Sequence, residues 1–328
     1  MRLARSEPLV TPLVSILIPC HNAACWLGAA IESALAQTHP DCEIIVVDDG
    51  STDNSLEISR SYESRGVRTA AQTNLGASAA RNHAFRLSRG TFIQYLDADD
   101  ILDPGKISAQ AALLVNSPPD TLSSGLWVRF SGKPGSHPAE SHLNQRDLSG
   151  VEFLQLFYEK ANMMQPGAWL SPRGLLEKAG PWDESLTVND DGEYFARVML
   201  RSSGIRYCPG AVVYYRSEGV QTLSRRRSPA ALRSVFRATE LITGHLLAAD
   251  RSERSLAAAA YAWKWTAFEL LPEEPSLSRD AENRCLELGG SNLPYPAGPR
   301  LSMLAGLIGW RRAKRLRNFL DSLRPTHA

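Results

Sequence analysis

The chain has 328 residues, of which 43% are apolar and 22% are charged, as in an ordinary globular protein. Its 36 basic residues nearly balance its 35 acidic ones, so the net charge of +1 gives no case for nucleic acid as a partner. This length allows one large domain with an appendage, or two domains.

The cysteine content argues against a disulfide framework and against a zinc site. The chain has five cysteines, an odd number, and no Cys-x-x-Cys pair. The apolar run at residues 14–19 is too short for a signal peptide or a membrane span. We therefore expect a cytoplasmic protein without a spanning helix.

The first hundred residues alternate between short apolar runs and amphipathic segments. Strands are expected at residues 14–18, 43–47, 67–72 and 91–96, with Pro19 ending the first. Helices are expected at residues 24–37, 53–65 and 78–88. Strands that alternate with helices at this spacing predict right-handed crossovers and a mostly parallel sheet, buried on both faces.

The pattern changes after residue 100. Further helices are expected at residues 104–115, 150–161 and 191–202, strands at 121–130 and 211–215, and a loop at 131–146. From Pro229 onward the chain is largely helical. We place a boundary near Arg227, which divides the chain into residues 1–227 and a helical region of residues 228–328.

The segment Tyr-Leu-Asp-Ala-Asp-Asp at residues 95–100 places three carboxylates within four residues, directly after an apolar run. On a strand, Asp97 and Asp99 would point to the same face. Two such carboxylates form half a site for a hard divalent cation, with substrate phosphates as the other half. By itself the segment is also what a solvated acidic turn looks like.

Two other predicted strands also end in polar residues, Pro-Cys-His-Asn at 19–22 and Asp-Asp-Gly-Ser at 48–51. The second alone is an ordinary turn signature. In an open α/β sheet, however, ligands bind outside the carboxyl ends of the strands. The coincidence of three such ends therefore points to a ligand site.

Four segments in this order resemble family 2 glycosyltransferases. They are residues 14–22 (Val-Ser-Ile-Leu-Ile-Pro-Cys-His-Asn), 46–53 (Val-Val-Asp-Asp-Gly-Ser-Thr-Asp), 74–82 (Asn-Leu-Gly-Ala-Ser-Ala-Ala-Arg-Asn) and 95–100. The resemblance runs to about Arg216 and not into the last hundred residues. It implies an α/β protein of the GT-A fold, with a Rossmann-like nucleotide-binding half and a mixed, mostly parallel sheet. A helical C-terminal extension would follow.

On the nucleotide side, the resemblance implies that Asp49 accepts a hydrogen bond from a base ring N–H. Uracil, thymine and guanine present such a donor. Pro19 would lie near the base, although it could simply end its strand. Asn22 belongs to the same implied nucleotide site, although a structural role in its loop is open. Arg81 would face the nucleotide or its diphosphate, or else form a buried pair with a nearby aspartate.

On the phosphate side, the resemblance implies that Asp99 binds a divalent cation, Mn²⁺ or Mg²⁺, directly. Asp97 would meet the ribose or share the metal. Asp100 is expected to point away and to cap the helix that begins near Pro104.

A third acidic cluster, Asn-Asp-Asp-Gly-Glu at residues 189–193, resembles the family's Glu-Asp motif. Asp190 then stands in place of the usual glutamate, and Asp191 is the general base. The alternative is that these acids only cap the next helix. Trp182, shortly upstream, would either stack on a sugar or belong to the core. One departure is that Tyr215-Arg216 is followed by Ser217 and Glu218, whereas many relatives carry a histidine two positions after such a Tyr-Arg pair.

The implied reaction is inverting transfer of a sugar from a nucleotide diphosphate sugar, with a UDP-sugar favoured, to a saccharide or lipid-linked saccharide. Bacterial cell-surface polysaccharide or glycolipid synthesis is the expected setting. One alternative is a nucleotidyltransferase of similar fold, but the chain lacks a glycine-rich loop with a lysine after its first strand. The other is a nucleotide-sugar-binding protein without catalysis.

Residues 300–324 are apolar, then basic, then apolar again. This pattern fits a helix that lies on the inner face of a membrane, near lipid-linked acceptors. It equally fits a terminal helix that packs on the body of the protein and exposes its basic face to solvent.

Overall fold

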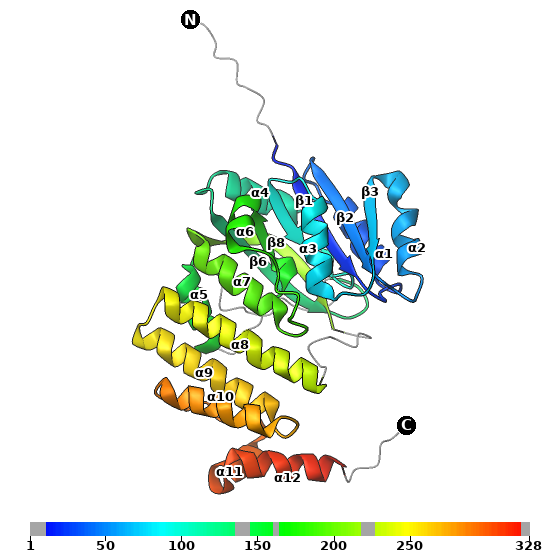
Figure 1. Ribbon diagram of the computed structural model, residues 1–328. Coiled ribbons are helices and arrows are strands. Elements are labelled where there is room, and N and C mark those ends of the chain that lie inside the picture. Colours follow the sequence, from blue (N-terminus) through cyan, green and yellow to red (C-terminus); the bar gives the residue numbers. More distant parts are fainter. Residues whose placement is uncertain (1–10, 135–144, 160–163, 218–226, 323–328) are drawn as a thin grey trace, which may run out of the picture.

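The computed structural model describes residues 11–134, 145–159, 164–217 and 227–322. An eight-stranded sheet forms the upper part of the molecule in Figure 1, and a stack of helices lies below it. The strand order is β3-β2-β1-β4-β7-β6-β8-β5. Parts of the expected loop at 131–146, the helix at 150–161 and the tail at 300–324 lie outside the described residues.

The first half of the sheet is parallel, as the alternating pattern predicts. It consists of β1 (Val14–Cys20), β2 (Cys42–Asp49), β3 (Val67–Gln72) and β4 (Phe92–Tyr95). The helices of this half are α1 (Leu27–Leu35), α2 (Ser55–Ser61) and α3 (Ala77–Leu87). β1, β2 and β4 are buried along nearly their whole length, because helices cover both faces, whereas the edge strand β3 is only partly buried.

Pro19 does not end the first strand, and this prediction is wrong. β1 continues through Pro19, which pairs with Val47 of β2, to Cys20. On the other side, β1 and β4 pair only from Val14 to Leu17. Pro19 therefore has a strand on one side only, which is where a proline without an N–H is tolerated. The same divergence opens the carboxyl end of the sheet between β1 and β4.

The second half of the sheet is mixed. β6 (Thr121–Phe130) pairs parallel with β8 (Gly204–Arg216) and antiparallel with β7 (Trp169–Pro172), and β7 joins β4 antiparallel. The short β5 (Ile101–Leu102) pairs antiparallel with β8. The helices of this half are α4 (Lys106–Val115), α5 (Gly150–Glu159), α6 (Arg173–Ala179) and α7 (Asp190–Arg201). The mixed α/β sheet confirms the expected fold class.

Several of these elements were not expected from the sequence. β5 and β7 have only two and four residues, too short for a periodic pattern. β8 begins at Gly204 rather than at residue 211, because its first half contains Gly and Pro, which count against a strand. α6, with seven residues, is also too short to show a clear amphipathic period.

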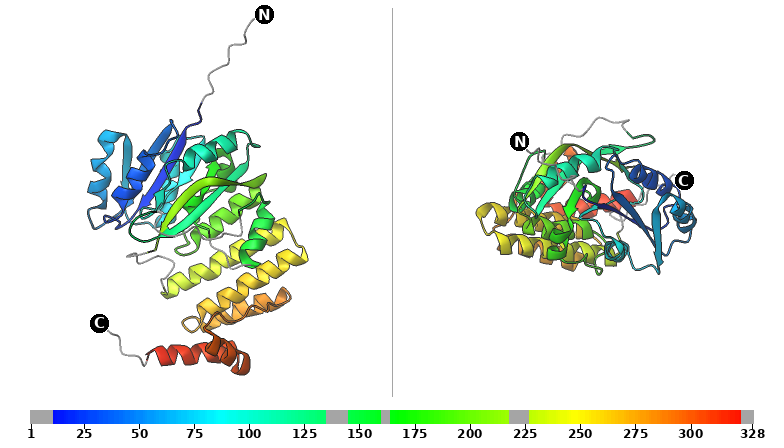
Figure 2. Two further views of the ribbon diagram at one scale, coloured as in Figure 1. Left: turned by 180° about the vertical axis from the view of Figure 1, so that it is seen from behind. Right: turned by 90° about the horizontal axis from the view of Figure 1, so that it is seen from above.

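The C-terminal part is helical, as predicted. It consists of α8 (Pro229–Ala249), α9 (Glu253–Leu270), α10 (Pro275–Glu287), α11 (Pro299–Ile308) and α12 (Trp310–Ser322), stacked away from the sheet (Figures 1 and 2). Ile242 and Leu246 of α8 and Ala258 of α9 join the core that contains Trp169. A smaller core around Trp263 lies among α8, α9 and α10. The division at residue 227 stays a prediction. Within the described residues, no helix has both the length and the apolar content needed to cross a membrane.

We predict that Gly150→Ala destabilises the fold. Gly150 begins α5 directly against α7, and a Cβ there would lie 2.1 Å from the carbonyl oxygen of Met199. Since backbone must move to make room, the free energy of unfolding should fall by about 3 kcal/mol. Urea unfolding followed by circular dichroism measures it. Gly174→Ala in α6 is the control, because its Cβ meets nothing within 4 Å. Equal midpoints for the two variants would contradict the packing argument.

Candidate active site

Asp49, at the end of β2, organises the turn that leads into α3. Its Oδ1 accepts hydrogen bonds from Gln72 Nε2 (2.8 Å) and the Leu75 N–H (2.9 Å), and its Oδ2 accepts one from the Gly76 N–H (2.8 Å). A carboxylate has about four lone-pair positions, so one remains on Oδ2. The structure therefore gives Asp49 a structural role that the motif does not reveal, and contact with a base stays a prediction.

Asn22 ties the loop after β1 to the loop after β2. Its side-chain Oδ1 accepts from the Thr52 N–H at 2.8 Å, and its own N–H donates to Ser51 Oγ at 3.0 Å. Its φ of +51° lies in the left-handed region, which asparagine tolerates. The structural role left open for Asn22 is thus present, and contact with a nucleotide stays a prediction. Pro19 is buried in β1 directly before this loop.

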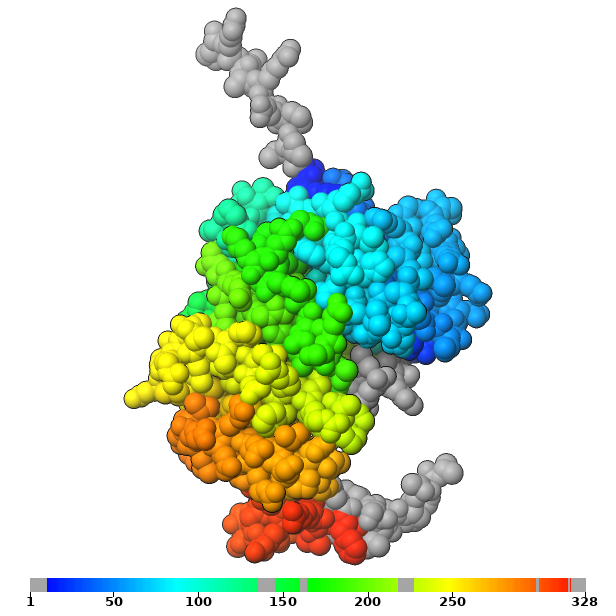
Figure 3. Space-filling view, in the orientation of Figure 1, coloured from blue at the N-terminus to red at the C-terminus, as the bar shows by residue number. Residues whose placement is uncertain are grey.

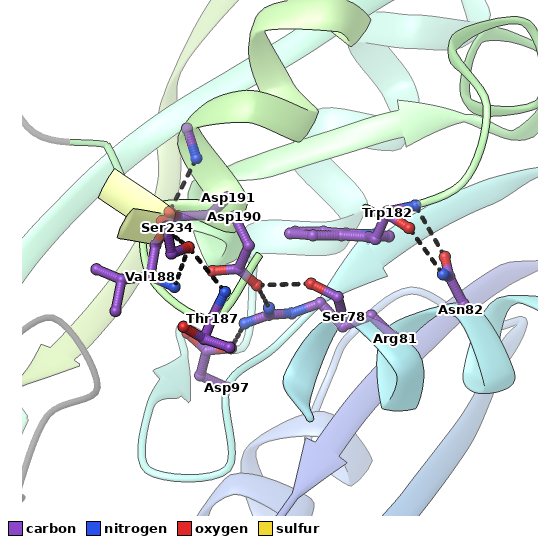
Figure 4. Close-up of polar contacts among 11 residues, drawn as sticks. Ser78, Arg81, Asn82, Asp97, Trp182, Thr187, Val188, Asp190, Asp191 and Ser234 are labelled. Carbon is purple, nitrogen blue, oxygen red and sulfur yellow. Dashed lines mark hydrogen bonds and ion pairs between the residues drawn. The ribbon is translucent and has the colours of Figure 1, made fainter. Parts of the chain in front are cut away.

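Arg81, from α3, bridges two acidic clusters that are far apart in the sequence (Figure 4). Its Nη2 donates to Asp97 Oδ1 at 2.9 Å, and its Nη1 donates to Asp190 Oδ2 at 2.8 Å. Burial disfavours its charge, but the two carboxylates outweigh this and raise the pKa of Arg81 above its ordinary value. Of the two roles left open by the sequence, the structure shows the buried pair, and contact with a diphosphate stays a prediction.

The ring of Trp182 packs against the guanidinium group of Arg81. The guanidinium carbon of Arg81 lies 4.5 Å from the centre of the Trp182 ring, and Trp182 stacks on Tyr194 at 4.0 Å. Asn82 holds the tryptophan backbone by two hydrogen bonds, to its N–H and its carbonyl. Trp182 is buried, so the core role is confirmed and it does not face a sugar.

Asp190 and Asp191 begin α7, directly after Asn189, whose φ is +60°. Asp190 Oδ2 accepts from Ser78 Oγ at 3.0 Å as well as from Arg81. Asp191 Oδ1 accepts from the Gly192 N–H at 2.8 Å, the next residue in the chain. Burial and the neighbouring charge of Asp190 raise the pKa of Asp191 to about 7. Perturbation of this size is typical of functional groups. The two acids lie in the first turn of α7, whose N-cap is Asn189 and has no side-chain capping hydrogen bond.

The turn after β4 places Asp97 and Asp99 at the site and buries Asp100. Burial and the charge of Asp97 raise the pKa of Asp99 to about 6. Asp100 Oδ1 accepts from the Arg216 N–H at 3.0 Å, so Asp100 does not cap the next helix, and that prediction is wrong. Asp103 instead accepts from the Gly105 N–H, immediately before α4 begins at Lys106.

Arg216, at the end of β8, fixes this acidic turn from the other side. Its Nε donates to the carbonyl oxygen of Asp99 at 2.9 Å, and its guanidinium lies between the rings of Trp26 and Phe130, at 4.2 and 4.5 Å. The Tyr-Arg pair at residues 215–216 is visible in the sequence. The contacts of Arg216 with the acidic turn depend on the pairing of β8 with β5, which brings the two segments together.

The acids at this site fit a divalent cation only in part. Across the described ranges, no group of three or more His, Cys, Asp or Glu side chains is arranged to hold a metal ion. Asp97 and Asp99 still provide two neighbouring oxygen donors, and burial, followed by the negative charge of Asp97, raises the pKa of Asp99. This set suits a hard cation whose remaining ligands are substrate phosphates.

Comparison with known proteins agrees with this arrangement. The model of the family described as "Glycosyl transferase family 2" matches residues 15–180. The chain belongs to glycosyltransferase family 2. This membership confirms the resemblance.

The curated relatives that the chain matches include a glycosyltransferase and a chondroitin synthase. The glycosyltransferase EpsJ of Bacillus subtilis is 28% identical over 211 residues, which is 62% of this chain and 61% of EpsJ. The chondroitin synthase of Escherichia coli is 44% identical over 98 residues, 29% of this chain and 14% of that protein. The chain thus matches less than two thirds of the length of these relatives.

The fold of this family member is also that of solved glycosyltransferases. Residues 1–349 of TarS from S. aureus, in complex with UDP-GlcNAc, superpose with a TM-score of 0.71 at 17% identity, covering 93% of this chain and 91% of that one. The mannosyltransferase PcManGT from Pyrobaculum calidifontis, in complex with GDP-Man and Mn²⁺, gives a TM-score of 0.53 at 17% identity, covering 94% and 84%. These likenesses confirm the GT-A fold.

Ser234 of α8 is a residue of the site that sequence reasoning missed. Its hydroxyl accepts from the N–H groups of Thr187 (2.9 Å) and Val188 (3.1 Å) and donates to the carbonyl oxygen of Val188 (2.9 Å). It is buried and lies beside the acids in Figure 4. One serine of the helical extension therefore holds the turn that presents Asp190 and Asp191. No motif marks it, because its partners are backbone groups.

We predict that Ser234→Ala slows sugar transfer more than it destabilises the fold. The N–H groups of Thr187 and Val188 would lose their acceptor, so the free energy of unfolding should fall by about 2 kcal/mol. The loosened turn should lower kcat about tenfold or more, because small displacements of catalytic groups are costly. The test measures kcat from nucleotide diphosphate release and stability from Tm.

Ser278→Ala is the matched control for Ser234→Ala. Ser278 is equally buried, and its hydroxyl donates to the carbonyl oxygen of Ala267 at 2.8 Å, within the helical extension and away from the acids. It should lower Tm with unchanged kcat. If the two variants have the same kcat at equal stability, Ser234 does not position the acids.

Proposed function

We propose that this chain transfers a sugar from a nucleotide diphosphate sugar, with a UDP-sugar favoured, to an acceptor hydroxyl with inversion at the anomeric carbon. The observation that carries the proposal is the Arg81 bridge. It brings Asp97, beside Asp99 at the end of β4, together with Asp190, beside Asp191 at the start of α7. A pair of acids for the phosphate side thus lies near a second pair for the acceptor side.

The nucleotide would lie over the carboxyl ends of β1 and β2, near Pro19, Asn22 and Asp49. This is the position at which open α/β sheets bind ligands, and β1 and β4 diverge there. The open lone pair on Asp49 Oδ2 suits the ring N–H of uracil. Arg81, which already serves two carboxylates, would act on the diphosphate through the charge it places beside Asp97.

Asp191 is the proposed general base. With a pKa of about 7, it is ionised in a substantial fraction of molecules at neutral pH and still basic enough to accept a proton. The acceptor oxygen attacks the anomeric carbon from the face opposite the diphosphate while its proton passes to Asp191. A single displacement inverts that carbon. Asp190, paired with Arg81 and Ser78, would hold the base in place.

Asp99 and Asp97 are the residues that would hold Mn²⁺ or Mg²⁺ together with the donor phosphates. When bound, such an ion neutralises charge that develops on the diphosphate as it leaves. The acidic turn is pre-positioned for this, since Arg216 holds the Asp99 backbone and Asp97 is fixed by Arg81. Negative charge crowded at this turn favours a cation there.

The proposed acceptor is a saccharide or a lipid-linked saccharide, in bacterial cell-surface polysaccharide or glycolipid synthesis. Support comes from the names of similar proteins, among them a chondroitin synthase and TarS in complex with UDP-GlcNAc. We further propose that residues 1–227 carry the reaction, while residues 228–328 form the helical region that supports it.

The proposal is tested by nucleotide diphosphate release from a panel of UDP-, GDP- and dTDP-sugars with Mn²⁺. We expect release with at least one donor, its loss with a chelator, and a drop of about a hundredfold or more in Asp99→Asn. Asp280→Asn, at an exposed position of α10, is the control and should keep full activity. Release that persists in Asp99→Asn and with chelator would refute the metal assignment, and no release from any donor would refute the transferase.

The rate should depend on pH through Asp191. The base must be ionised, and its pKa is raised to about 7, so kcat/KM should rise as the pH increases through about 7 and level off above it. Asp191→Asn should remove transfer while nucleotide binding persists, as measured by calorimetry with UDP. A flat kcat/KM between pH 5.5 and 8.5 would show that Asp191 is not the base.

A further inference from the structure

Large apolar side chains are exposed chiefly on α11 and α12. Over the ranges that the structure describes, eight large hydrophobic side chains are exposed, and five of them lie on these two helices: Met303, Leu307, Ile308, Leu316 and Phe319. Leu307 is 77% exposed and Phe319 is 60% exposed. The other three, Leu75, Val115 and Leu286, lie on separate elements. Exposed apolar residues that gather in one place mark an interaction site.

α12 has two distinct faces. Its inward face is packed: Ala313 is fully buried, Arg311 pairs with Glu282 at 2.6 Å, and Lys314 donates to the carbonyl oxygen of Phe268. Its outward face carries Arg312, Arg315, Leu316 and Phe319, spaced at three and four residues, which places them on one stripe of a helix. The described side chains of that stripe are exposed.

The charge of this helical pair is opposite to that of the rest of the chain. Residues 299–322 contain six basic residues and one acid, a net charge of +5, whereas the whole chain has a net charge of only +1. The remaining residues therefore carry a net charge of −4. Arg312 and Arg315 are exposed, and within the described part of the chain neither forms an ion pair. In Figure 3 these helices form the end of the molecule farthest from the sheet.

We propose that α11 and α12 form a docking surface for a membrane with anionic lipids. The exposed apolar side chains would enter the boundary between headgroups and acyl chains, while Arg312 and Arg315 meet lipid phosphates. A second copy of the chain is a poorer occupant, because two faces of charge +5 would repel each other. Attachment of this kind lies in the interface and needs no spanning helix. The inference is independent of sugar transfer and is read out by vesicle binding.

The test is flotation of the full chain with vesicles of phosphatidylglycerol and phosphatidylcholine, and with phosphatidylcholine alone. We expect binding to the anionic vesicles and a loss of about tenfold or more in 0.5 M salt, because salt screens exposed charges. Leu307→Ser with Phe319→Ser removes the apolar part, and Arg312→Gln with Arg315→Gln removes the charged part. Each pair should weaken binding about tenfold or more.

The control variants remove an exposed leucine and an exposed arginine outside α11 and α12. Leu286→Ser replaces a leucine of α10 that is 66% exposed, and Arg279→Gln replaces an exposed arginine of the same helix. Both should bind vesicles as the unmodified chain does. Equal binding of all variants, or no binding to anionic vesicles, would overturn the proposal. The proposal would also be overturned if vesicle binding is absent and light scattering shows self-association that Leu307→Ser with Phe319→Ser abolishes.

Discussion

The arrangement of the site depends on one buried guanidinium. Asp97, Asp190 and Asp191 come from segments about ninety residues apart, and without a cation between them their charges would repel. Arg81 supplies that cation, with one nitrogen on Asp97 and another on Asp190. Since both carboxylates and the arginine are largely withdrawn from water, removal of one partner of such a pair costs about 3–5 kcal/mol. The ring of Trp182 lies against the arginine, and Asn82 holds the Trp182 backbone, so these core residues serve the acids as well as the fold.

The helical region is tied to the same acids and cannot be regarded as a mere appendage. Ser234 of α8 holds the turn before Asp190 by three hydrogen bonds, and His245 of the same helix approaches Glu193 of α7 at 3.4 Å. Glu193 in turn pairs with Arg197, which donates to the carbonyl oxygens of Ala179 and Pro181 beside Trp182. α8 therefore contacts the turn before Asp190 directly and is connected through Glu193 and Arg197 of α7 to the backbone beside Trp182.

Sequence reasoning found the strand ends and their acids because parallel strands place their carboxyl ends at one edge, whatever the details of the loops. It failed where the outcome depends on contacts between distant segments. Asp100 resembles a helix cap, but the N–H of Arg216, more than a hundred residues later, captures its carboxylate. Pro19 resembles a strand end, but β1 and β4 diverge before it, so it stays in the strand. Ser234 has no motif at all, since a hydroxyl that binds backbone groups leaves no pattern in either partner.

The position of the helical stack relates the two proposals to each other. β1 begins at the top of the sheet in Figure 1 and runs downwards, so the carboxyl ends of the parallel strands lie on the side of the sheet towards the helical stack that ends in α11 and α12. A membrane beneath α11 and α12 would therefore lie on the side of the molecule to which those strand ends point. The helices α8 to α10 would separate the lipid surface from Asp191. An acceptor that is anchored in lipid would therefore have to extend its saccharide past these helices to reach Asp191.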